Sequence, residues 1–193
     1  DAAESGSQSV SINITEDDAR PTVSFSSSTY SVNEGNALTV TVTMSGLVAE
    51  DVNVGLGSTI SGTATQNTDY TISTSSIVIS EGQTSGTRTF SSTEDNIYEG
   101  NETATFTISG IGGGDASPAV ENGNQQAVVT IVDDESAPTV TLSTSASSIA
   151  ENSDGTITVT ATMSAADTAD VTVAIGTSGA ATEGTDYTDG SGN

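Results

Sequence analysis

Carboxylates are the reactive side chains of this sequence, and two short stretches concentrate them. The stretch from Ser91 to Glu102 holds four: Glu94, Asp95, Glu99 and Glu102. A second group, Asp133-Asp134-Glu135, directly follows an apolar alternation, and no Lys, Arg or His stands beside either group. Two like charges about 4 Å apart repel by about 4 kcal/mol at an effective dielectric constant of about 20. These side chains must therefore either spread into water or close around cations.

The missing residue types narrow the chemistry. The sequence contains neither Cys nor His, so it lacks the sulfur and nitrogen ligands that zinc and copper prefer. Six to eight oxygen ligands on adaptable loops suit calcium better than magnesium. The absence of His also removes the commonest general base. Paired carboxylates can cleave glycosides, but no Trp is present to stack on a sugar. We therefore expect no enzyme.

Composition limits the partners and the location. The 193 residues include 26 acidic ones and two basic ones, Arg20 and Arg88, for a net charge of −24. This charge excludes nucleic acid, because phosphate binding needs Lys and Arg. No apolar run is long enough to span a bilayer, so direct membrane insertion is not expected. Scarce Lys, no Cys and many Thr, Ser, Asp and Gly are typical of a secreted prokaryotic protein, which predicts an extracellular or cell-surface location.

Apolar residues alternate with polar ones along much of the chain, which is the pattern of half-buried strands. The alternation is clearest in five ranges: 8–15, 38–44, 52–56, 102–109 and 126–132. No window shows the helical period of 3.6 residues. Residues 110–124, rich in Gly, Ala and Asn, predict a flexible hairpin connection. The class is all-β, and the strand spacing predicts Greek-key β-sandwiches.

Parts of the chain repeat at a spacing of 117 residues. Pro21-Thr22-Val23 recurs as Pro138-Thr139-Val140, and Asp69-Tyr70 recurs as Asp186-Tyr187. The triplet Glu16-Asp17-Asp18 stands at the same distance before Asp133-Asp134-Glu135. These matches predict three parts: residues 1–19 as the final strand of a preceding repeat, residues 20–135 as a complete domain, and residues 136–193 as the first half of a following repeat.

Turns of a Greek-key sandwich can gather at one end of it. In the complete domain, Glu34 lies in a turn between two predicted strands, and Asp69 follows a loop. The two acidic groups lie in other connections. We therefore expect these carboxylates to converge on a hard divalent cation. A simpler alternative is that residues 94–102 form a solvated acidic turn that keeps the protein soluble.

Four motifs of the complete domain occur in an order that resembles the Calx-beta family. They are Val32-Asn33-Glu34-Gly35, Gly62-Thr63-Ala64 leading to Asp69-Tyr70, Asp95-Asn96-Ile97-Tyr98-Glu99-Gly100-Asn101-Glu102, and Ile131-Val132-Asp133-Asp134-Glu135. The resemblance implies tandem immunoglobulin-like sandwiches that bind calcium at one end. It implies these ligands: Glu34, Asp69, Glu94, Asp95, Glu99, Glu102, Asp133, Asp134, Glu135 and the carbonyl of Ile97.

The sequence departs from the most acidic members of that family at Glu94 and Glu135, where Asp is common. In the incomplete copies, Glu151 and Asp186 match the first two ligand positions, and Glu16, Asp17 and Asp18 match the closing triplet. Neither set makes a whole site. Any calcium is therefore expected in the complete domain.

These inferences predict a calcium-rigidified repeat segment of an extracellular structural or adhesion protein, as a stalk or filament. Its expected partners are neighbouring repeats of the same chain, identical chains in a fibre, or a surface receptor or polysaccharide bound through other domains. Two alternatives stay open. The repeats are subunits of a self-assembling filament or sheath in which calcium is incidental, or they are spacers joined to a catalytic domain elsewhere.

Overall fold

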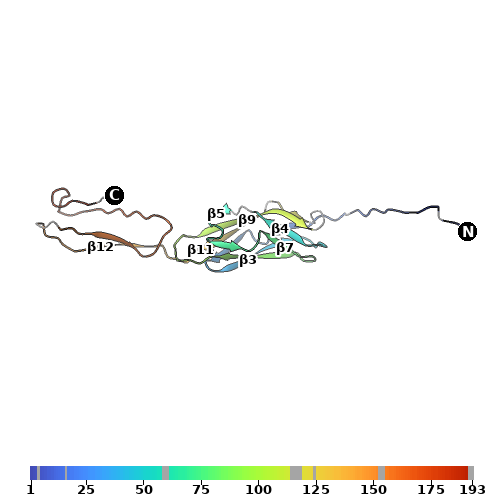
Figure 1. Ribbon diagram of the computed structural model, residues 1–193, viewed down its shortest axis with the longest axis horizontal. Coiled ribbons are helices and arrows are strands. Elements are labelled where there is room, and N and C mark those ends of the chain that lie inside the picture. Colours follow the sequence, from blue (N-terminus) through green and yellow to red (C-terminus); the bar gives the residue numbers. More distant parts are fainter. Residues whose placement is uncertain are drawn as a thin grey trace.

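The computed structural model describes residues 1–3, 5–15, 17–57, 61–113, 119–123, 125–151 and 155–190. Those residues form strands and loops, with no helix among them, and none of them forms a helix able to cross a membrane. Figure 1 shows a central sandwich, an extended N-terminal segment at one end of it and the later residues at the other. The prediction of an all-β sandwich is confirmed.

Two sheets make up the sandwich. The first has the order β10 (Val120–Glu121), β1 (Thr22–Phe25), β3 (Ala37–Met44), β8 (Ser85–Ser92) and β6 (Tyr70–Ile72). The second has the order β2 (Thr29–Asn33), β11 (Gln126–Val132), β9 (Glu102–Gly113), β4 (Val52–Leu56) and β7 (Ser76–Ile79), with β5 (Ser61–Gly62) also beside β9. β1 and β2 follow each other in the chain but join different sheets, so the chain crosses between the sheets at once.

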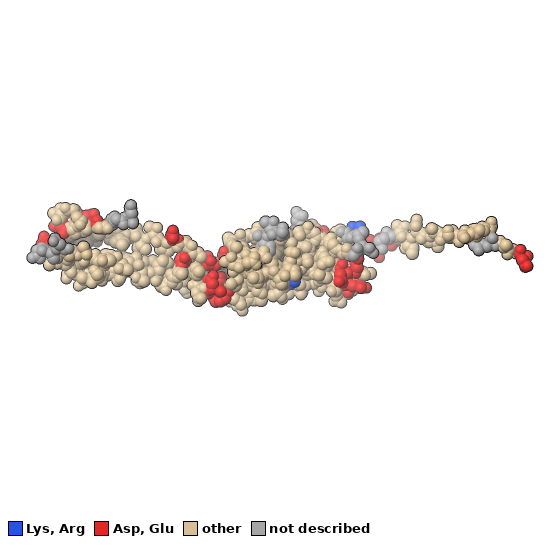
Figure 2. Space-filling model, in the orientation of Figure 1, with Lys and Arg blue, Asp and Glu red and all other residues tan. Residues whose placement is uncertain are grey.

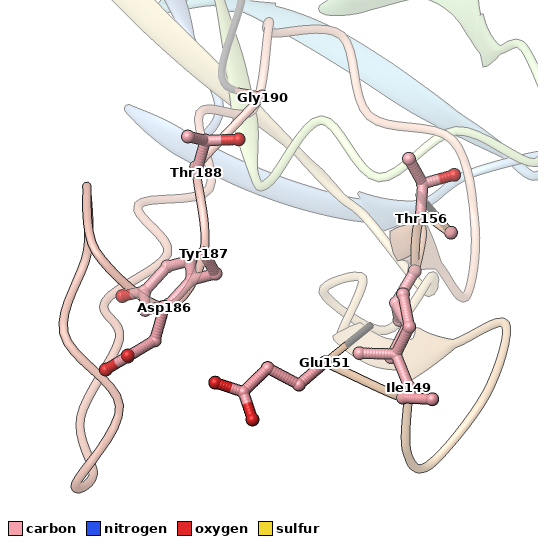
Figure 3. A pocket seen from close by; sticks show the side chains of 10 residues that line it. Ile149, Glu151, Thr156, Asp186, Tyr187, Thr188 and Gly190 are labelled. Atoms are coloured by element: carbon pink, nitrogen blue, oxygen red, sulfur yellow. The ribbon is translucent and has the colours of Figure 1, made fainter. Parts of the chain in front are cut away.

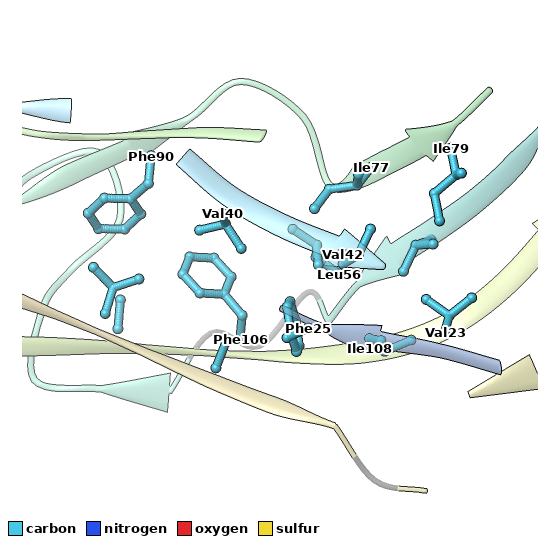
Figure 4. Close-up of a cluster of buried hydrophobic side chains, with 14 of the residues drawn as sticks. Val23, Phe25, Val40, Val42, Leu56, Ile77, Ile79, Phe90, Phe106 and Ile108 are labelled. Atoms are coloured by element: carbon cyan, nitrogen blue, oxygen red, sulfur yellow. The ribbon is translucent and has the colours of Figure 1, made fainter. Parts of the chain in front are cut away.

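The core lies between the sheets and consists of the apolar half of each alternation (Figure 4). Val40, Val42 and Phe106 are fully buried, while their neighbours in the sequence face outward. Phe90 stacks on Tyr70 with ring centroids 4.8 Å apart and meets Phe106 edge to face at 5.9 Å. Such pairs add to the hydrophobic gain of burial. With few aromatics available, this chain of three rings links the core to the loop that carries Asp69.

The predicted connection at residues 110–124 is wrong in its first part. β9 continues to Gly113, because β4 offers it a partner there, with Val54 opposite Ile111. The pairing of β4 with β9 shifts register between Gly55 and Leu56, as at a β-bulge. Residues 114–118 and 124 of the connection lie outside the described residues, and Val120–Glu121 forms the short strand β10.

The alternation at residues 8–15 does not produce a strand in this structure. Val10, Ile12 and Ile14 are 88%, 83% and 96% exposed. Their counterparts in β11 lie between β2 and β9, and a strand without partners has no ladder. Among the described residues of the following segment, the strands β12 (Val140–Thr144) and β13 (Val159–Met163) pair with each other. The predicted boundaries of the three parts stay a prediction.

The two sheets approach each other closely where β7 meets β8. A Cβ atom on Gly86 would collide with the carbonyl of Val78 and lie 2.8 Å from Ile77 Cγ2. Beside it, Arg88 Nη2 donates to the Ser76 carbonyl at 2.7 Å and Nη1 to Ser73 Oγ at 3.2 Å. One of the two arginines therefore covers exposed backbone at the edge of β7 and joins the sheets.

Gly86→Ala should destabilise the domain by about 1–3 kcal/mol, because backbone atoms must move to admit the methyl group. Urea unfolding followed by circular dichroism measures the change. Gly110→Ala is the matched control, since a Cβ there meets nothing within 4 Å. Equal urea midpoints for Gly86→Ala and the unmodified chain would contradict the close packing of the sheets.

Candidate metal centre

Five strand ends meet at one end of the sandwich, which we call the acidic pole. β2 and β11 run parallel and finish side by side, at Asn33 and Val132. β9 begins beside the end of β11, and β6 begins beside the end of β8. The segments that follow or precede these ends carry the predicted ligands. The topology therefore brings distant parts of the sequence to one place.

The turn after β2 holds Glu34, which is only 7% exposed. Its backbone N–H donates to the Val132 carbonyl at 3.1 Å, and Gly35 follows with φ of +68°, a value that suits glycine. A side chain on Gly35 would also run into Glu94. Ser92 Oγ donates to the carbonyls of Asn33 and Asn36, both at 2.9 Å. Buried Ser92 thus fixes this turn, a role that no motif in the sequence indicates.

Asp69 is held by a turn that closes on itself. Its Oδ2 accepts the backbone N–H of Thr65 at 2.5 Å, and Asn67, with φ of 70°, donates from its backbone to the Tyr70 carbonyl at 2.8 Å. The same turn forms in the following segment, where Asp186 Oδ2 accepts from the Thr182 backbone at 2.7 Å. Since that segment lacks a complete sandwich, the turn is a local property of its sequence.

Asp133 organises the loop between β8 and β9. Its Oδ2 accepts the backbone N–H groups of Glu99, at 2.8 Å, and of Gly100. Its Oδ1 accepts the backbone N–H of Glu135 at 2.8 Å. Burial opposes its charge, but the hydrogen bonds from Gly100, Glu135 and Glu99 outweigh burial and lower the pKa of Asp133. This carboxylate is therefore ionised and fixed in position.

The carboxylates converge in three groups whose oxygens lie within 4.8 Å of one another: Glu34, Asp133 and Glu135; Asp69, Glu99 and Glu102; Glu94, Asp134 and Glu135. The first two groups share no residue, so their carboxylates could hold two separate cations. Eight of the ten predicted ligands belong to these groups. Asp95 and Ile97 lie in the same loop outside them, where Asp95 Oδ1 accepts the Ile97 N–H at 2.7 Å. A role for the Ile97 carbonyl stays a prediction.

Several of these oxygens lack a hydrogen-bond partner. Buried Oε2 atoms of Glu34, Glu102 and Glu135 have none, and an unpaired buried carboxylate oxygen is costly. Burial, followed by the charges of Asp133 and Glu135, raises the pKa of Glu34 to about 7. Burial and the neighbouring Asp69 raise the pKa of Glu102 to about 7. Burial and the neighbouring charges thus favour the protonated forms of both side chains when no cation is bound.

Acidic residues gather at both ends of the sandwich, and the side between them in Figure 2 carries few. At the end opposite the acidic pole, Asp51 Oδ1 accepts the backbone N–H of Glu81 at 2.8 Å. Among the described residues, every group of three convergent carboxylates lies at the acidic pole. Charge density alone therefore does not mark the site; convergence does.

The counterparts in the incomplete copies are not brought together in this way. Glu151 and Asp186 line an open cavity of ≈ 550 Å³ with Ile149 and Tyr187 (Figure 3). The third ligand segment has no counterpart in residues 136–193. At the start of the chain, Asp17 and Asp18 are exposed, and Glu16 lies outside the described residues.

Comparisons with known proteins agree with this arrangement of strands. No curated protein sequence matches the chain. Among solved structures, CBD12 from CALX1.2 is similar with a TM-score of 0.50 and 20% identity, over 59% of this chain and 44% of that one. The apo-form Calx CBD1 domain has a TM-score of 0.49 and 18% identity, over 61% of this chain and 100% of that one.

At such identities the likeness concerns the fold alone, and the chain spans less than half the length of CBD12. The family relationship rests on sequence instead. The model of the Calx-beta domain matches residues 16–135 and again residues 133–193. This chain therefore belongs to the Calx-beta domain family.

Proposed function

We propose that the central sandwich binds Ca²⁺ at its acidic pole, and that the chain is a non-catalytic, calcium-rigidified segment of an extracellular structural protein. One observation carries the calcium proposal. Buried carboxylate oxygens of Glu34, Glu102 and Glu135 lack partners within three convergent groups. Surface carboxylates in a merely solubilising turn would face water, so the convergence argues against that alternative.

The donor set suits calcium by type and by number. Each group supplies three carboxylates, which is up to six oxygens, and Ca²⁺ takes six to eight at flexible geometry. Mg²⁺ demands a stricter octahedron and keeps several waters. One ion would lie among Glu34, Asp133 and Glu135, and another among Asp69, Glu99 and Glu102. Glu94 and Asp134, together with the shared Glu135, would extend the first site.

Bound cations would remove the repulsion that now opposes this arrangement. They would join the ends of β2 and β11 and order the loop between β8 and β9. That loop also meets the following segment, since Tyr98 forms a backbone bridge with Asp167. Ordering the loop should therefore stiffen the passage from one repeat to the next, which suits a stalk or filament.

Composition supports the extracellular location. A net charge of −24 favours solubility. Because the sequence contains no Cys, its folding does not depend on disulfide bonds. Neighbouring repeats of the same chain would be its constant partners.

Terbium luminescence tests the binding site. Tb³⁺ takes oxygen ligands like Ca²⁺, and Tyr98 and Tyr70 lie next to the ligands Glu99 and Asp69, where they can sensitise its emission. We expect sensitised emission that falls as Ca²⁺ displaces Tb³⁺. Asp69→Asn should weaken the affinity for Tb³⁺ at least about tenfold, or about 1.4 kcal/mol, because it removes one charged ligand from the group beside both tyrosines.

Asp186→Asn is the matched control, because Asp186 occupies the same repeat position in the incomplete copy. It should leave the titration unchanged. Absence of sensitised emission, or equal effects of the two variants, would refute a calcium site at the acidic pole.

A further inference from the structure

Two strands near the points where the chain enters and leaves the sandwich, β2 and β11, pair directly with each other. β2 lies parallel to β11 over five residue pairs, from Thr29 opposite Val128 to Asn33 opposite Val132. Hydrogen bonds extend this ladder at both ends, from Val128 N to the Ser28 carbonyl at 2.9 Å and from Glu34 N to the Val132 carbonyl at 3.1 Å. β2 and β11, the first and last strands of the second sheet in chain order, are neighbours in it and form one continuous ladder, which we call the seam.

This pairing has a mechanical consequence. The chain enters the sandwich through β1 and β2 and leaves it through β11, and Figure 1 shows the two termini at opposite ends of the molecule. Tension between the termini pulls β2 and β11 in opposite directions along their own length. In a parallel pair all ladder hydrogen bonds then carry the load together, whereas strands peeled from one end release them one at a time.

We propose that the β2–β11 seam is a load-bearing clamp, and that calcium bound at the acidic pole reinforces it. The second half rests on the proposed function. Glu34 directly follows β2, and Asp133 directly follows β11, yet they belong to one carboxylate group with Glu135. A cation held by these residues joins the two sliding strands at their ends and opposes their separation.

The second carboxylate group provides an internal control. Asp69, Glu99 and Glu102 belong to the loop before β6, the loop after β8 and the start of β9. None of these segments is a terminal strand. A cation in this group stabilises the sandwich without joining β2 to β11.

Single-molecule force spectroscopy on the full chain tests the clamp. The sequence has no Cys, so two introduced Cys residues serve as unique attachment points. Ser27→Cys with Ala137→Cys attaches the force to the start of β2 and beyond the end of β11, which loads the seam in shear. Ser27→Cys with Gln125→Cys attaches the force to the starts of both strands and peels them apart. In chelator at one constant force, we expect unfolding in shear to be at least about tenfold slower, the factor given by one additional hydrogen bond in the barrier.

Shear unfolding should release about 390 Å of chain, since residues 27–137 extend at roughly 3.5 Å each. That length identifies the event as the sandwich rather than the end segments. Equal unfolding rates in the two geometries would overturn the clamp.

Calcium provides the second test, with thermal stability measured in parallel. We expect Ca²⁺ to slow shear unfolding by at least about a further tenfold. Glu34→Gln should lose most of this slowing, whereas Glu102→Gln should keep the slowing but lose part of the thermal stabilisation by Ca²⁺. The reinforcement would be overturned if both variants lost the slowing of shear unfolding equally, or if Ca²⁺ slowed peeling but not shear. If Ca²⁺ changes neither the midpoint of thermal unfolding nor the unfolding rate under force, the proposed function fails. The difference between the shear and peeling rates in chelator still decides whether the seam is a clamp.

Discussion

Free Ca²⁺ at 100 times its Kd should raise the midpoint of thermal unfolding of the metal-free chain by roughly 15–20 °C, and excess chelator should reverse the gain. Each site adds about 2.7 kcal/mol at a free concentration 100 times its Kd. The two carboxylate groups without a shared residue would therefore add about 5 kcal/mol, and 1 kcal/mol corresponds to roughly 4 °C for a domain of this size. Differential scanning calorimetry measures both values.

Single substitutions divide this gain between the groups. Glu99→Ala removes a ligand of the Asp69 group, and Glu34→Gln removes one of the Glu34 group. The double variant should lose most of the calcium-dependent increase. Glu81→Ala is the control, since Glu81 is an exposed acidic residue at the opposite end. A midpoint unaffected by Ca²⁺, or equal losses in the control, would show that the acidic pole does not bind calcium.

Without calcium, acidification from about pH 8 to pH 5 should stabilise the protein, by roughly 5–10 °C in the midpoint. Glu34 and Glu102 each have a folded-state pKa of about 7, raised from 4.5. The folded state then binds more protons than the unfolded state between these values, so the stability that these two groups contribute is fully present below pH 4.5 and is lost as the pH rises through 7. After allowance for screening by solvent, each group contributes about 1 kcal/mol.

Other carboxylates in the site leave this sign unchanged. Burial also raises the pKa of Glu99, with the same direction of effect. The pKa of Asp133 is lowered, but the stability that it contributes is lost only below its ordinary value of 3.8, outside this window. Saturating Ca²⁺ should reverse the dependence, because protons then compete with the metal for the same oxygens.

Calorimetry at several pH values, with chelator and with Ca²⁺, measures the two slopes. A double variant with Glu34→Gln and Glu102→Gln should flatten the slope in chelator, since neither amide titrates. If the metal-free protein instead becomes less stable on acidification to pH 5, these carboxylates are not buried against one another as described.

Strand periodicity shows where local sequence is sufficient for prediction. Val40, Val42 and Phe106 are buried as their alternation predicts, because side chains on a strand point to opposite faces in turn. The Asp69 turn is also local, since Asp186 forms it again without a complete domain. Both features depend on neighbours within a few residues.

Residues 8–15 show where local pattern is not sufficient. Their alternation equals that of β11, yet Val10, Ile12 and Ile14 remain exposed, because a strand needs partners that its own sequence does not contain. The extension of β9 to Gly113 shows the converse, a strand that forms because a partner is present. A glycine-rich segment becomes a strand because β4 pairs with it.

The sequence by itself determined the all-β class, the family and the identity of the acidic residues, since these follow from residue types, their period and their order. Only the tertiary structure decided how the carboxylates divide into groups, which oxygens lack partners, and that Glu34 and Asp133 follow two strands paired in parallel. Those properties depend on distances between residues about 100 positions apart, which the packing of the two sheets sets. The acidic stretch from Ser91 to Glu102 is therefore one contribution to a site that the whole sandwich assembles.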